Sequence, residues 1–80
     1  MPKVFEWSGY RFHFFANEGD PLEPPQIHVR KGRDNAKFWL RPDVSLASSK
    51  GFPPRVLSQL TRVIEGRRDE IESAWHDFFS

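Results

Sequence analysis

The chain has 80 residues, and 12 Lys and Arg against 11 Asp and Glu give a formal net charge of +1. This length accommodates one domain, which we expect to span residues 1–80. The absence of cysteine excludes a disulfide scaffold, a thiolate zinc site and a cysteine nucleophile. No apolar run approaches the roughly 18 residues of a membrane-spanning helix, and the N-terminus has no signal-peptide hydrophobic region. We therefore expect a cytoplasmic protein.

The first half of the chain predicts short strands. Residues 10–15 alternate aromatic and polar side chains, and this period of two is typical of a strand with one buried face. Ser8-Gly9 and Gly32–Asn35 are turn signals that close two hairpins, whereas Asn17–Pro25, with three acids and three prolines, indicates a stiff loop. We expect four strands, or five if Asp43–Ala47 adds another, and a loop at Ser48–Gly51. The four are Lys3–Trp7, Tyr10–Phe15, Gln26–Lys31 and Ala36–Leu40.

The second half predicts helix. Pro53 and Pro54 suit a helix start, because the first turn has spare backbone donors. An apolar stripe at helical spacing follows, interrupted around Gly66. A continuous helix over residues 55–79 would be about 37 Å long, but a six-residue strand spans only about 20 Å. Either the helix breaks near Gly66, or its far end projects. In the first case Trp75 and Phe78 anchor the helix to the core; in the second they form a partner interface.

These patterns predict an α+β fold, with a small antiparallel sheet of four or five strands and one long or broken C-terminal helix packed on one face. Tyr10, Phe12 and Phe14 should face the helix, together with the apolar residues of the later strands. The opposite face should be basic and free of acids. Its expected members are Arg11, His13, Gln26, His28, Arg30, Lys37, Trp39 and Arg41.

Such a face is a plausible platform for single-stranded nucleic acid, because Arg and Lys meet phosphates and Trp39 can stack on a base. An ordinary solvated surface and a surface for an acidic protein partner are the alternatives. His28 is the most informative residue, because a histidine beside Arg30 can serve acid–base chemistry on a phosphodiester. A structural role is its alternative. A metal site of His13 and His28 with Glu18 or Asp20 matches no metal motif, so we expect neither a metal nor a cofactor.

Several of these residues also resemble a known family. Asn17-Glu18, Pro24-Pro25-Gln26-Ile27-His28-Val29, Ala36 and a late helix with Glu70, Ile71 and Trp75 resemble a small bacterial family, domain of unknown function 4160. Its members usually read Pro-Pro-His-x-His, and here Gln26 replaces the first histidine. The resemblance implies the toxin half of a two-gene toxin–antitoxin module. It also implies a cognate antitoxin partner resembling domain of unknown function 2442.

The leading functional hypothesis is a toxin that inhibits growth by acting on translation or nucleic acid, with RNA or the ribosome as target. His28, Arg30 and Gln26 would be its catalytic residues, and Asn17 and Glu18 would position the loop. The docking surface would comprise Arg11, His13, Arg33, Lys37, Trp39 and Arg41. One alternative is a non-catalytic binding or regulatory module, either an antitoxin half or a homodimeric adaptor that uses Trp75 and Phe78. Another is a metal-dependent hydrolase.

Overall fold

Five strands form one antiparallel sheet, in which strands that follow one another in the chain are also neighbours in space. The computed structural model describes residues 3–18 and 23–80. A short 3-10 helix, η1 (Ala16–Glu18), lies between the second and third strands. The strands are β1 (Lys3–Trp7), β2 (Tyr10–His13), β3 (Gln26–Lys31), β4 (Asp34–Trp39) and β5 (Ser45–Lys50).

Two tight turns set the register of the hairpins. Ser8 and Gly9 both have positive φ, 52° and 83°, which matches the twist that a two-residue hairpin turn requires. In the second hairpin Lys31 pairs with Asp34, so only two residues form the turn, and the first of them, Gly32, has φ of 61°. The four-residue turn expected at Gly32–Asn35 is therefore shorter than predicted.

The strand predictions are confirmed for β1 and β3, whose bounds agree with the sequence pattern. β2 ends at His13, two residues before the predicted end, and β4 begins at Asp34, two residues early. The fifth strand exists but is shifted from Asp43–Ala47 to Ser45–Lys50, and the loop predicted over residues 48–50 is wrong. All six β5 side chains are exposed, so no buried face marks this strand in the sequence.

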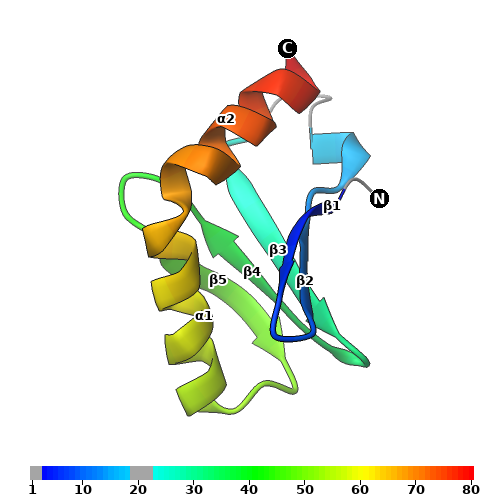
Figure 1. The fold of residues 1–80 in the computed structure, drawn as a ribbon, viewed down its shortest axis with the longest axis vertical. Coiled ribbons are helices and arrows are strands. Elements are labelled where there is room, and N and C mark those ends of the chain that lie inside the picture. Colours follow the sequence, from blue (N-terminus) through cyan, green and yellow to red (C-terminus); the bar gives the residue numbers. More distant parts are fainter. Residues whose placement is uncertain (1–2, 19–22) are drawn as a thin grey trace.

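The helical segment is broken in two, as one of the two sequence-based alternatives predicted. α1 (Pro54–Gly66) and α2 (Arg68–Phe79) meet at Arg67, whose φ of −119° and ψ of 18° leave the helical region. Both helices cover the same face of the sheet and run in different directions (Figure 1). Pro53 precedes α1, and its carbonyl accepts hydrogen bonds from the N–H groups of Val56 and Leu57. Among residues 3–18 and 23–80, no helix is long and apolar enough to cross a membrane.

The core lies between the sheet and the two helices. Its aromatic centre includes Phe14 and Trp75, whose rings meet edge to face at 5.3 Å. Trp75 is only 2% exposed, so it anchors α2 and offers no surface to a partner, whereas Phe78 is 44% exposed. Tyr10 is only partly buried. The buried apolar residues are Phe5, Phe12, Phe14, Ile27, Val29, Ala36, Phe38, Leu40, Phe52, Leu60, Ile64, Ile71 and Trp75.

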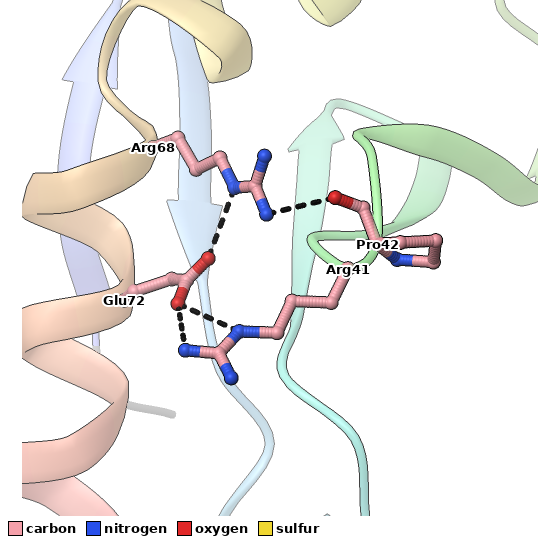
Figure 2. A network of polar contacts seen from close by, with 4 residues as sticks. All are labelled: Arg41, Pro42, Arg68 and Glu72. Atoms are coloured by element: carbon pink, nitrogen blue, oxygen red, sulfur yellow. Dashed lines mark hydrogen bonds and ion pairs between the residues drawn. The ribbon is translucent and has the colours of Figure 1, made fainter.

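A polar network fastens the chain after β4 to α2 (Figure 2). The Arg41 guanidinium donates to Oε1 of Glu72 through Nε at 2.9 Å, and Arg68 Nε donates to Oε2 of the same carboxylate at 3.0 Å. Arg68 also donates to the Pro42 carbonyl at 2.9 Å. Arg41 therefore bonds to a helix on the core side of the sheet, and its predicted place on the basic outer face is wrong.

A candidate acid–base site on the outer face of the sheet

One row of side chains crosses four strands on the face of the sheet opposite the helices. His13 of β2 pairs in register with His28 of β3, His28 pairs with Lys37 of β4, and Lys37 pairs with Ser48 of β5. Side chains directly opposite one another in a sheet lie on the same face. These four residues, called the histidine row below, therefore bring two imidazoles, an ammonium and a hydroxyl to one stripe.

A second row lies two residues along each strand. Arg11 pairs with Arg30, Arg30 with Asn35, and Asn35 with Lys50. Two residues of a strand span about 6.7 Å, which is the separation expected between this arginine row and the histidine row. Glu6 of β1 pairs with Arg11, so the outer face is basic but not free of acids, contrary to the prediction.

The Glu18 carboxylate is held against the histidine row. Its Oε2 bonds to Nε2 of His28, and its Oε1 accepts the backbone N–H of Phe15 at 3.2 Å. The backbone of Glu18 reinforces this position, because its N–H donates to the Phe15 carbonyl and its carbonyl accepts the N–H of Glu23. Glu18 is only 4% exposed. These contacts hold the Glu18 carboxylate beside the imidazole of His28, and the role of Glu18 in positioning the loop stays a prediction.

Aromatic stacking completes the surroundings of His28. Its ring centroid lies 4.0 Å from that of Phe15 and 5.7 Å from that of His13, with the two imidazoles inclined by 23°. The sequence-based site omitted Phe15. The signal for it was present, since Phe15 lies two residues after His13 and a period of two places both side chains on the outer face.

A cavity of about 360 Å³ opens beside these groups, which is within the range of small-ligand sites. Its wall combines cationic, imidazole, amide and hydroxyl groups with one aromatic ring. The sequence-based site also omitted Asn35 and Ser48, because Asn35 was assigned to a turn and Ser48 to a loop. The lining residues are His13, Phe15, His28, Val29, Arg30, Asn35, Ala36, Lys37 and Ser48.

His13 differs electrostatically from an ordinary surface histidine. Burial is the largest cause of the lowered pKa of His13, and the charge of His28 is the second. A backbone hydrogen bond at Arg11 raises the pKa, and the charge of Arg30 lowers it by a smaller amount. A lowered pKa favours the neutral imidazole near neutral pH. His13 is therefore suited to accept a proton or a hydrogen bond inside the cavity.

Gln26 lies on β3 two residues before His28 but does not reach the cavity. Its side chain is fully buried, and Nε2 donates to Glu23 at 2.7 Å and to the Pro24 carbonyl at 3.3 Å. Its Oε1 has no hydrogen-bond partner among the described residues. Gln26 thus stabilises the segment Glu23–Pro24 that precedes β3. Its predicted place among the reacting groups does not fit this geometry.

Three further predicted residues, Trp39, Arg33 and Asn17, do not line the cavity. Trp39 follows Lys37 on β4, and the Lys37 ammonium lies 4.4 Å from the centre of its ring, so the two side chains form a cation–aromatic pair. Arg33 is exposed in the turn between β3 and β4, and Asn17 is exposed in η1. Asp20, the other carboxylate considered for a metal, lies outside the described residues. Within residues 3–18 and 23–80, no three His, Asp or Glu side chains are arranged to hold a metal ion.

The chain belongs to the family described as Domain of unknown function (DUF4160), whose model matches residues 9–76. The matched segment contains β2, β3 and β4, and hence Glu18, both histidines of the histidine row and the paired Arg11 and Arg30. The family resemblance inferred from the sequence is therefore confirmed. Comparisons with curated proteins and with solved structures found no match.

Proposed function

We propose that this member of the DUF4160 family is a growth-inhibiting toxin that binds single-stranded RNA on its outer sheet face and acts on a phosphodiester in the cavity beside His28. The observation that carries the proposal is the hydrogen bond between Glu18 and His28, set among Arg30, Lys37 and a second imidazole. A carboxylate that orients a histidine next to cationic groups is a recurring arrangement for acid–base chemistry on anionic substrates.

The cations and the aromatic rings have complementary tasks in this proposal. Arg30 and Lys37 line the cavity and would meet phosphate oxygens. Trp39, beside the Lys37 ammonium, would stack on a base that leaves the cavity. The combination of phosphate contacts and stacking favours a single strand, because the bases of a duplex are already stacked on one another.

The two histidines would divide the proton transfers. His13, with its lowered pKa, would accept the proton of a ribose 2′-hydroxyl, whose oxygen attacks phosphorus as the bond from phosphorus to the 5′-oxygen breaks. Protonated His28 would give a proton to the leaving 5′-oxygen through Nδ1, while Glu18 holds Nε2. The products are a 2′,3′-cyclic phosphate and a 5′-hydroxyl, and Arg30 would stabilise the charge on the phosphoryl oxygens.

The family resemblance implies the biological setting of a toxin–antitoxin module. A cognate antitoxin would then cover the outer face with an acidic segment, because cationic side chains line its hollows. Inhibition by such a partner is expected to weaken as the salt concentration rises.

Growth arrest with matched RNA cleavage tests this function. The chain, His28→Ala and the surface control His76→Ala are expressed in bacteria, and each purified protein is incubated with labelled single-stranded RNA in the presence of a metal chelator. We expect arrest and cyclic-phosphate products from the chain and from the control, and at least a hundredfold loss of cleavage in His28→Ala. Growth and intact RNA with all three proteins would refute the proposal.

A non-catalytic binding module is the second candidate, and one observation favours it. The contact with Glu18 occupies Nε2 of His28, and it ties η1 to β3 as a structural fastening would. In that case His28→Ala lowers stability and none of the proteins cleaves RNA. The chain itself still binds RNA. Gln26→His belongs in the same assay, because it restores the family's histidine pair; if the introduced imidazole takes part in the reaction, this variant cleaves faster.

A further inference from the structure

Two arginines lie opposite one another on neighbouring strands of the outer face. Arg11 of β2 and Arg30 of β3 are register partners on neighbouring strands, and both are exposed. Like charges directly opposite one another destabilise a sheet. Among the described residues no carboxylate forms an ion pair with either guanidinium; Glu6, on the other side of Arg11, bonds to Lys3 at 2.6 Å. The pair therefore concentrates positive charge that an anion would neutralise.

The surface is hollowed on both sides of this pair. One hollow of about 230 Å³ is lined by Lys3, Arg11, His13 and Arg30. Another of about 360 Å³ lies toward the hairpin turns and is lined by Gly9, Arg11, Arg30, Lys31 and Gly32. Arg30 also lines the cavity beside His28. Cationic hollows thus continue from the proposed reaction site along β2 and β3, and Arg30 takes part in all three.

We propose that Arg11 and Arg30 form a phosphate subsite that binds the phosphodiester next to the one held beside His28. This subsite rests on the proposed function, since it takes the adjacent phosphate of the same RNA strand. The arginine row lies about 6.7 Å from the histidine row, comparable to the separation of neighbouring phosphates in an extended strand. Two guanidiniums can each offer paired N–H donors to phosphate oxygens.

The subsite predicts how binding affinity depends on the number of phosphates in the ligand. A nucleotide with one phosphate fills only one of the two sites, whereas a dinucleotide with two phosphates fills both. The second phosphate should therefore add affinity beyond what its base contributes. It also relieves the repulsion between Arg11 and Arg30, so part of the gain comes from the protein itself.

Calorimetric titration with 2′-O-methyl uridine ligands tests this, because the methyl group blocks the attacking oxygen and prevents cleavage. The ligands are the 3′-monophosphate and the dinucleotide with two phosphates. They are titrated into the chain, Arg11→Gln, Arg30→Gln and the double variant, with Arg62→Gln on the exposed surface of α1 as the control. We expect the second phosphate to tighten binding to the chain and to the control at least tenfold. This gain should fall below threefold in the double variant.

Further measurements separate the possible results. The slope of log affinity against log salt should become shallower by about 0.7 for each phosphate that a variant no longer neutralises. Melting of the unliganded Arg11→Gln should occur no lower than that of the chain, which shows that the variant folds. Binding of both ligands without a gain, or a gain that survives in the double variant, overturns the subsite and leaves the proposed function intact. No binding of either ligand or of longer single-stranded RNA overturns both.

A peptide of six glutamates provides the remaining competitor. If the arginine pair is a phosphate site, this peptide should be a weak competitor. Displacing a labelled two-phosphate ligand should take at least a tenfold higher concentration of peptide charge than of charge on the unlabelled ligand. Equal displacement would overturn the subsite in favour of an acidic protein partner.

Discussion

Glu18 and His28 are ten residues apart in the chain and meet in a largely buried contact between Oε2 and Nε2. The contact connects η1 to β3. The side chains are 5% and 12% exposed, respectively, so water competes little for either group. The pair therefore has two consequences, one for stability and one for the orientation of the imidazole.

Replacing Glu18 by glutamine should lower the free energy of unfolding by about 1 to 3 kcal/mol, because His28 and the Phe15 N–H no longer have a charged acceptor. Urea unfolding of Glu18→Gln measures this change. Glu65→Gln, on the exposed surface of α1, is the control and should unfold at the midpoint of the chain itself. Equal midpoints for the two variants would contradict the prediction.

The lowered pKa of His13 should make stability depend on pH. Burial is its main cause, with the charges of His28 and Arg30 adding to it. The unfolded chain then binds a proton more readily than the folded chain does. The stabilising contribution is complete above the unfolded pKa of about 6.5 and is lost progressively as the pH falls from there toward the lowered folded pKa.

Urea midpoints between pH 5 and pH 8 test this dependence. His13→Gln should flatten the decline on the acid side, whereas the exposed His76→Gln should leave it unchanged. The interpretation would be wrong if His13→Gln loses stability on acidification as steeply as the chain does.

Glu72 should also make stability depend on pH, in a more acidic range than His13 does. The hydrogen bond from Arg41 is the largest cause of its lowered pKa, and Arg68 lowers the pKa further, against the opposing effect of burial. The stabilisation is present above the unfolded pKa and is lost as the pH falls through the lowered folded pKa. Glu72→Gln should cost about 1 kcal/mol at pH 7, because both partners are partly exposed to solvent.

The same variant should lose its difference from the chain as the pH falls through the lowered folded pKa of Glu72, because the carboxyl then becomes protonated in the folded as well as in the unfolded state. Chemical unfolding at pH 7 and pH 2.5 provides this comparison, with Asp77→Asn as the exposed control. A difference that is as large at pH 2.5 as at pH 7 would mean that packing, not the charge of Glu72, stabilises this end of the sheet.

Gly51 and Gly66 should respond in opposite ways to alanine. Gly51 joins β5 to the segment before α1 with φ of 96°, and an added Cβ would collide with Oδ1 of Asp34. Gly51→Ala should therefore lower the free energy of unfolding by more than about 1 kcal/mol. Gly66 ends α1 with nothing within 4 Å of an added Cβ, so Gly66→Ala should raise stability by about 0.5 to 1 kcal/mol.

Thermal unfolding of both alanine variants makes the comparison direct. The Gly66→Ala variant also tests whether glycine causes the helix break. If glycine were the cause, alanine would fuse α1 with α2 and raise the helical signal in circular dichroism. We expect the signal to stay the same, because the contacts of Trp75 with Phe14 and of Glu72 with Arg41 set the direction of α2. A destabilised Gly66→Ala would show that this position needs glycine.

Local patterns in the chain were enough to predict which side chains of the long strands face the core and that the helical segment begins after Pro53. These features depend on periodicity and backbone chemistry, and both can be recognised within a single segment of the sequence. The basic character of the outer face was equally visible in Arg11, His28 and Arg30. The family followed from residues spread along the matched segment.

Which of these residues meet was settled by the folding of the whole chain. The pairing of His13 with His28 and of Arg11 with Arg30 depends on strand register, which no single segment contains. The approach of Glu18 to His28 brings η1 beside β3, a contact between residues ten positions apart in the chain. Arg41 was predicted on the wrong face because, beyond the end of β4, its direction is set by Glu72 on α2. β5 left no pattern because its side chains are exposed, and the backbone pairing that forms it is independent of side-chain polarity.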